Sequence, residues 1–236
     1  MAHTILICDD DADIRAALTI YLQQEGYEVV CGQNGHDALR AIENQAIHLI
    51  LLDIMMPEMD GITAAVKIRE KSNVPILFLS AKSEDTDRIL GLHMGGDDYI
   101  TKPYNPVELM ARVKAALRRY ARLGGLGETQ APPTIGIYQT GGLYLDDIHK
   151  RVNVDGEEVA LTALEYNILK FLMSNMERVF SSTQIYEAVW EEPAFHVSKT
   201  VSVHIRHIRE KIEINPKEPR YLKVIYGLGY KVVRHE

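Results

Sequence analysis

A run of three aspartates, residues 9–11, directly follows the apolar run TILIC near the start of the chain. Carboxylates packed this closely repel one another, so either water screens them or a cation holds them. Asp53, Ser80 and Lys102 likewise stand at or just past the ends of apolar runs. Carboxylates that hold Mg²⁺, together with a hydroxyl and an ammonium, are the groups that phosphoryl transfer requires. If these run ends meet, the sequence predicts a magnesium-dependent phosphoryl-transfer site.

The elements that would bring them together are regular in the first half of the chain. Apolar runs at TILIC, YEVVC, HLILL, PILFL and DDYI alternate with stretches of helical spacing at 12–25, 35–44, 61–71, 84–94 and 105–122. Five βα units in succession predict a parallel sheet covered by helices on both faces. Ligands of such sheets bind beyond the carboxyl ends of the strands, so four strand ends are expected to share one pocket.

The pattern changes after residue 122. Segment 123–134, LGGLGETQAPPT, is rich in Gly and Pro and has no apolar period, which predicts a linker. Short β-like pieces follow from Ile135 to Leu161, then helix-like segments at 162–174, 181–189 and 198–213, and a hairpin in YLKVIYGLGYKVV that turns at Gly227 and Gly229. We therefore predict a domain at 1–122, a linker at 123–134 and a second domain at 135–236.

Charge and composition limit the classes of function. The chain of 236 residues has a formal net charge of −7, which argues against wholesale coating by nucleic acid, but segment 198–236 carries more Lys and Arg than Asp and Glu. No apolar run approaches the roughly 18 residues of a membrane span, and we expect a cytoplasmic protein with no membrane partner. Cys8 and Cys31 are expected to be buried thiols and not a disulfide.

The motifs CDDD, LLDIMMPEMDG, LSAK and GGDDYITKPY resemble the receiver domain of two-component response regulators, and LTALEYNILKFLM, VSVHIRHIREKI and YGLGYKV resemble the winged-helix output domain of the OmpR/PhoB family. The resemblance implies a flavodoxin-like, doubly wound (βα)5 receiver followed by an α+β winged helix. It implies a DNA-binding transcriptional regulator, not an enzyme, whose aspartate is phosphorylated by a sensor histidine kinase. Its other expected partners are a second copy of the chain when phosphorylated, double-stranded promoter DNA with direct repeats, and RNA polymerase.

The resemblance also assigns the pocket. Asp53 is the phosphoacceptor, and Mg²⁺ is held by Asp10, Asp53 and the backbone carbonyl of Met55, with Asp9 acting through water. Lys102 is the group that contacts the phosphoryl, and Ser80 and Tyr99 are the two members of the switch pair. Simpler readings remain for several of these side chains. Ser80 can cap a turn, Tyr99 can be an ordinary half-buried strand aromatic, and Asp11 is expected to be only a helix N-cap.

A mixed-charge surface near the fifth strand is the expected dimer face. Its members are Arg88, Asp97, Asp98, Glu108, Arg112 and Arg119. Both signs of charge can pair across a two-fold axis, and the family uses this surface to dimerise. The alternative is a solvated set of charges that contribute little individually.

Segment 198–212, SKTVSVHIRHIREKI, is the expected DNA-reading helix. Val201, Ile205, Ile208 and Ile212 form one apolar stripe that must face the core. The opposite face, together with one residue of the hairpin, is expected to bind DNA: Lys199, Thr200, Val203, Arg206, His207, Lys211 and Tyr226. His207 stands where the family usually has Arg or Lys, and Tyr226 where an Arg commonly enters the minor groove. A zinc site at His204 and His207 lacks a third ligand nearby in sequence.

Two other functions fit parts of the sequence. A phosphohydrolase of the haloacid dehalogenase kind also uses Mg²⁺ and two aspartates spaced like Asp9 and Asp11, but it leaves Asp53 unexplained and needs a cap that is not evident. A receiver whose winged helix binds protein in place of DNA is the second alternative.

Overall fold

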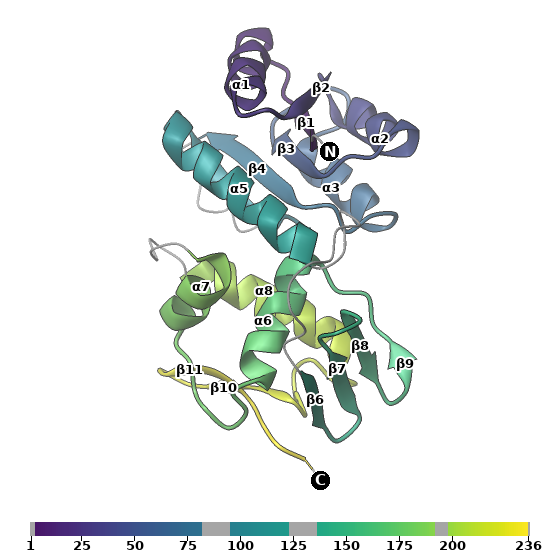
Figure 1. Cartoon of the computed structure of the whole chain (residues 1–236), viewed down its shortest axis with the longest axis vertical. Coiled ribbons are helices and arrows are strands. Elements are labelled where there is room, and N and C mark those ends of the chain that lie inside the picture. The colour runs from purple at the N-terminus through teal and green to yellow at the C-terminus, as the bar shows by residue number, and fades with distance from the viewer. Residues whose placement is uncertain (1–2, 82–94, 123–135, 192–197, 236) are drawn as a thin grey trace. The chain divides into compact units, whose positions relative to one another are not determined.

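A computed structural model describes residues 3–81, 95–122, 136–191 and 198–235. The chain divides into two compact units, Met1–Leu126 and Gly127–Glu236, each of which is described by itself (Figure 1). The predicted linker, 123–134, and the predicted helix at 84–94 lie outside the described residues.

The first unit is built on a parallel sheet of five strands in the order β2-β1-β3-β4-β5. The strands are β1 Thr4–Cys8, β2 Glu28–Gly32, β3 Leu49–Asp53, β4 Ile76–Ala81 and β5 Asp98–Lys102. The described helices are α1 Ala12–Gln24, α2 Gly35–Asn44, α3 Gly61–Arg69 and α5 Pro106–Arg122. The strand order is that of a flavodoxin-like doubly wound fold, as predicted.

Both faces of this sheet are buried, which explains why its strands are continuous apolar runs. Successive side chains of a strand point to opposite faces. Accordingly, Leu6 and Cys8 belong to the core cluster that includes residues of α2 and α3, while Ile5 and Ile7 belong to the cluster that includes residues of α1 and α5. The sheet is therefore held on both sides, and its carboxyl edge is a fixed platform.

The N-terminal ends of α1 and α3 lie close to that edge. Asp11 accepts backbone N–H groups from Asp13 and Ile14 and is the N-cap of α1, as predicted. At the start of α3, a Cβ on Gly61 would lie 2.0 Å from the carbonyl oxygen of Asp53, so only glycine fits there. The first turn of α3 thus packs directly against the end of β3.

The second unit has an antiparallel sheet, three helices and a separate hairpin. The sheet order is β6-β7-β8-β9, with β6 Ile137–Thr140, β7 Leu143–Asp146, β8 Arg151–Val154 and β9 Glu157–Glu158. The helices are α6 Ala163–Met173, α7 Ser182–Trp190 and α8 Ser198–Ile212, and the hairpin strands are β10 Leu222–Ile225 and β11 Gly229–Val232. This is the predicted α+β winged-helix arrangement.

Two smaller expectations were tested by the packing. Both cysteines are free, and Cys8 is buried, but the expectation that Cys31 is buried is wrong because it lies exposed at the edge strand β2. Within the described part of the chain, the helices are too short or too polar to cross a bilayer.

Candidate functional site

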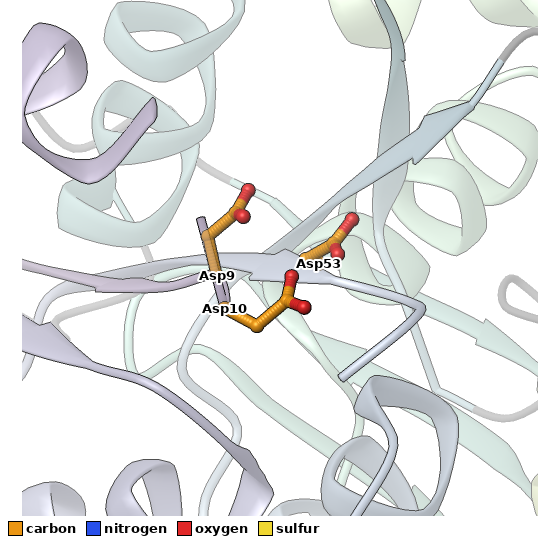
Figure 2. Close-up of side chains that lie close together, drawn as sticks. All are labelled: Asp9, Asp10 and Asp53. Carbon is orange, nitrogen blue, oxygen red and sulfur yellow. The ribbon is translucent and has the colours of Figure 1, made fainter. Parts of the chain in front are cut away.

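Three carboxylates converge at the carboxyl edge of the parallel sheet. Asp9 and Asp10 follow β1 and Asp53 ends β3, the neighbouring strand. One carboxylate oxygen from each lies within 4.8 Å of the others, and Figure 2 shows the three side chains gathered at the strand ends. Asp9 is fully buried, Asp53 is nearly so, and Asp10 is exposed. The cluster therefore combines two buried carboxylates with one that is exposed.

Lys102, at the end of β5, supplies positive charge to this pocket. Its Nζ donates to Asp9 Oδ2 at 2.7 Å and lies 3.0 Å from Asp53 Oδ1. The other oxygen of Asp9 accepts the backbone N–H of Asp11 at 3.0 Å. Asp9 thus uses both oxygens inside the protein, which leaves Asp53 and Asp10 as the carboxylates with more room for a ligand.

The charges of the pocket do not balance. Burial raises the pKa of Asp53; Lys102 opposes that effect, and the negative charges of Asp9 and Asp10 add to it, so the pKa stays above its ordinary value. A divalent cation with hard oxygen ligands would neutralise the excess, and one or two carboxylates plus water and phosphate oxygens are the ligands that Mg²⁺ prefers. The residues present therefore fit a magnesium ion.

The two predicted switch residues lie on the next two strands of the sheet, Ser80 on β4 beside the strand of Asp53 and Tyr99 on β5 one strand further away. Ser80 on β4 is buried, and its Oγ has no hydrogen-bond partner, which is unusual for a buried hydroxyl. Tyr99 on β5 is partly buried and packs against the core cluster that contains Phe78. Met55, whose carbonyl was assigned to the metal, has a side chain that is 71% exposed at the rim. The structure thus places an unsatisfied hydroxyl one strand away from Asp53.

Two members of the predicted dimer face, Asp97 and Arg119, are buried within the single chain. Asp97 is buried, and its Oδ2 accepts the backbone N–H of Ile76 at 2.8 Å and the guanidinium of Arg69 at 2.6 Å. Arg119 is buried as well, and Arg88 lies outside the described residues. The sequence pattern could not show this contact, because Arg69 lies in α3, 28 residues before Asp97 in the sequence.

The remaining charges of that face are paired inside one copy of the chain. Asp98 is buried, and its Oδ2 accepts from Arg112 at 2.7 Å, while Arg112 also bonds the exposed Glu108 at 3.0 Å. An interface with a second copy would have to exchange these bonds or add to them. Of the described members of the face, Glu108 is the one whose charge lies openly at the surface.

The apolar stripe of α8 is confirmed, but the face predicted to be exposed includes residues that are buried. Val201, Ile205, Ile208 and Ile212 are all buried. Thr200 and Val203 are also buried, at 3% and 2% exposure, so the prediction that they face DNA is wrong. The physical reason is that α8 packs against both α6 and α7, so more than one stripe of the helix is covered.

Two of the predicted DNA-reading side chains turn toward α6. The carboxylate of Glu165, which is buried, accepts from Lys211 Nζ at 2.7 Å and lies 3.8 Å from His207 Nδ1. It also accepts the backbone N–H of Thr162 at 2.8 Å and so completes a capping box at the start of α6. The side chain of His207 is partly covered, with 14% of its surface exposed, so less of it is open to DNA than the prediction assumed.

The sequence reasoning missed Glu165 as a functional anchor. The letters TALE carry the capping-box signal, because a Glu follows a Thr by three positions, but nothing in the sequence joins them to α8. Arg206 lies on the exposed side and pairs with Glu210 at 2.7 Å. The side chain of Lys199 lies outside what the structure describes.

The hairpin that follows α8 is fixed at its base by a second buried acid, which the sequence reasoning also missed. Glu213 accepts three backbone N–H groups, from Arg220 at 2.6 Å, Tyr221 at 2.9 Å and Leu222 at 2.8 Å. Tyr226, at the tip, is 91% exposed, and its assignment to DNA stays a prediction. The end of α8 and the start of β10 are therefore held as one piece.

Comparison with known proteins places the chain. Residues 5–114 match the response regulator receiver domain, and residues 156–232 match the family "Transcriptional regulatory protein, C terminal". The chain is 40% identical over 230 residues to the regulatory protein VanRc of Enterococcus gallinarum, covering 98% of both proteins. It is 38% identical to the alkaline phosphatase synthesis transcriptional regulatory protein PhoP of Bacillus subtilis, covering 98% of this chain and 97% of PhoP.

Two solved structures match along nearly the whole chain. A RitR mutant superposes with a TM-score of 0.75 at 25% identity, and DrrB of Thermotoga maritima, an OmpR/PhoB homologue, with 0.50 at 32% identity; each match covers 99% of this chain and 100% of the other. The chain therefore belongs to the response regulators of the OmpR/PhoB type, DNA-binding transcriptional regulators in which phosphorylation of a receiver aspartate by a histidine kinase controls dimerisation and promoter binding.

Proposed function

We propose that Asp53 is the residue that accepts the phosphoryl group. The observation that carries this assignment is the convergence of Asp53, Asp9 and Asp10, together with the ammonium of Lys102, which contacts both Asp9 and Asp53. An oxygen of Asp53 bonds to phosphorus as the P–N bond to the kinase histidine breaks, and the bonding electron pair stays on the imidazole nitrogen. Lys102 meets the negative charge on the transferring oxygens.

The metal ligands in this proposal are Asp10, Asp53 and the carbonyl of Met55, with Asp9 acting through water. The assignment of Asp9 to the outer role is supported by the two hydrogen bonds that already use its oxygens. A bound Mg²⁺ would neutralise the carboxylates and polarise the phosphoryl oxygens. Asp10 is the most exposed acid of the three and is placed to exchange water for a ligand.

The response to phosphorylation begins, in this proposal, at Ser80. Its buried and unpartnered hydroxyl is available to donate to a phosphoryl oxygen on Asp53, one strand away. Tyr99, on the next strand, then repacks, and the surface formed by β5 and α5 changes. The gain of about two negative charges at a strand end biases this two-state element.

The output is sequence-specific binding to promoter DNA by α8 and the hairpin, as a homodimer when phosphorylated. A basic surplus in segment 198–236 supports the assignment to DNA. The same proposal includes a cognate histidine kinase and RNA polymerase as partners and a cytoplasmic site of action. We assign regulation to the chain and no turnover of an external substrate.

The test is labelling with a small radioactive acyl phosphate. We expect label on the parent chain only when Mg²⁺ is present, and none on Asp53→Asn. Asp11→Asn is the matched control, because Asp11 is an exposed N-cap in the same aspartate run and should leave the label unchanged. Full labelling of Asp53→Asn would overturn the assignment, and label on Asp9 would favour the phosphohydrolase.

A further inference from the structure

Of the three clustered carboxylates, that of Asp10 is held least by its neighbours. The oxygens of Asp9 accept from the backbone N–H of Asp11 at 3.0 Å and from Lys102 at 2.7 Å. Among the described residues, no hydrogen bond or ion pair holds the exposed carboxylate of Asp10, which points toward Asp53 in Figure 2. The direction of the Asp10 side chain therefore depends on the backbone that carries it.

That backbone is held by a side chain of α1. Arg15 Nη1 donates to the carbonyl oxygen of Asp9 at 2.7 Å, in a partly buried bond. This oxygen belongs to the planar peptide group that joins Asp9 to Asp10, so a bond that fixes it also limits the direction in which Asp10 leaves the chain. A hydrogen bond from a charged donor is stronger than a neutral one. Arg15 thus acts on Asp10 through the peptide group between Asp9 and Asp10.

The guanidinium of Arg15 is delivered from a fixed element. The helix α1 begins at the N-cap Asp11, whose carbonyl accepts the N–H of Arg15 at 3.1 Å. One turn later, the hydroxyl of Thr19 donates to Arg15 O at 2.7 Å. Leu18 and Leu22 are fully buried and pack α1 against the sheet. The helix therefore presents Arg15 to the end of β1 in a defined position.

We propose that Arg15 is a positioning residue for the magnesium site, and that its bond to the peptide group between Asp9 and Asp10 keeps Asp10 ready to bind the metal. The proposal rests on the function proposed above, which assigns Asp10 to Mg²⁺. Charge alone predicts the opposite effect, because a guanidinium repels a divalent cation and its removal would tighten metal binding. The sign of the change in Mg²⁺ affinity therefore separates positioning from charge.

The test is isothermal titration of the full, unphosphorylated chain with Mg²⁺. Arg15→Met keeps an unbranched stem but loses the donor, and we expect it to bind Mg²⁺ about tenfold more weakly, as is common when a group that orients a metal ligand is removed. Arg15→Gln, whose amide lies closer to the backbone than a guanidinium nitrogen, should show the same loss and carries the test if Arg15→Met does not fold. Arg40→Met is the matched control at an exposed arginine of the same unit and should keep the parental affinity. Circular dichroism checks that each variant is folded.

A double-mutant cycle with Asp10→Asn shows whether Arg15 acts through Asp10. If it does, Arg15→Met should cause no further loss of affinity in the Asp10→Asn background, because the ligand that it positions is already gone. Parental or tighter Mg²⁺ binding by folded Arg15→Met and Arg15→Gln overturns the inference, as does a full tenfold loss in the Asp10→Asn background. A parent chain that binds no Mg²⁺, or an Asp10→Asn variant that binds it like the parent, would instead overturn the metal site of the proposed function.

Discussion

Each unit buries acidic side chains, but the two units differ in how far the charge of these acids is compensated by neighbouring groups. In the first unit, Asp53 is buried with too little positive charge around it, and burial holds its pKa above the ordinary value. In the second unit, the burial of Glu165 would raise its pKa, but Lys211 and the N–H of Thr162 outweigh that effect and the pKa is lowered. A buried acid that is under-neutralised is poised for a ligand or a reaction, whereas a fully satisfied one is an anchor.

In the second unit, the buried acids therefore serve as structural links that hold in place the elements proposed to bind DNA. Glu165 connects α6 to α8, and Glu213 connects the end of α8 to the hairpin. The first unit differs, because the proposed phosphoacceptor, Asp53, is itself buried at the edge of the sheet. The predictions below test whether this division holds.

The largest effect is expected for Glu213→Ala. The substitution leaves three backbone N–H groups without their acceptor, at about 1 to 3 kcal/mol for each that stays buried, so we expect a loss of roughly 3 to 5 kcal/mol in the second unit. Urea unfolding followed by Trp190, the single tryptophan, reports this unit alone. Glu218→Ala, at an exposed neighbouring acid, should change little. Equal stabilities for the two variants would contradict the anchor role.

Val203→Ala should cost about 2 kcal/mol through the cavity it leaves, with no change in base preference on a randomised library. Arg206→Ala is its counterpart on the exposed side of α8. That variant should keep parental stability, bind all sequences more weakly and lower the salt slope by about 0.9. Relaxed base preference in Val203→Ala would show that the buried side chain reaches DNA after all.

The acid pocket was predictable from sequence because a parallel sheet fixes where strand ends meet. Asp9, Asp53 and Lys102 each lie at or just after the end of an apolar run, and in a parallel sheet these ends all lie at the same edge. Residue spacing could not show that the hydroxyl of Ser80 has no hydrogen-bond partner, because this depends on how its neighbours pack.

The face of α8 was less predictable, for a physical reason. The apolar stripe and the adjacent positions 200, 203 and 207 have the same helical period, so periodicity cannot show how wide the buried arc is. That width depends on α6 and α7, which cover two sides of the helix. The partners of Lys211 and Asp97 come from 46 and 28 residues away, and no local pattern links them.

A smaller effect of opposite sign is expected for Asp53→Asn. Removing an under-neutralised buried carboxylate should stabilise the first unit by about 1 kcal/mol in magnesium-free buffer, as is common for groups kept for function at the expense of stability. The measurement is thermal unfolding of the full chain by circular dichroism, with Asp11→Asn as the control. A destabilised Asp53→Asn would mean that the bond to Lys102 outweighs the burial of the charge.

The smallest effect is on the acid limb of the stability profile. The folded pKa of Glu165 lies below its ordinary value of 4.5, so the stability it contributes is present above that pH and is lost as the pH falls through the lower folded value. Asp53 has the opposite sign: the folded pKa is raised above 3.8, so its contribution is complete below that value and is lost as the pH rises through the folded pKa. Acidification below about pH 4.5 should thus weaken the second unit through Glu165, while it removes the destabilising charge of Asp53 from the first unit.

Glu165→Gln cannot titrate, so the unfolding of this variant, followed by Trp190, should depend less on pH in that range than the unfolding of the parent. Glu187→Gln, at an exposed acid of α7, should keep the parental dependence. Parallel acid limbs for the parent and Glu165→Gln would show that the charge of Glu165 does not hold α6 to α8.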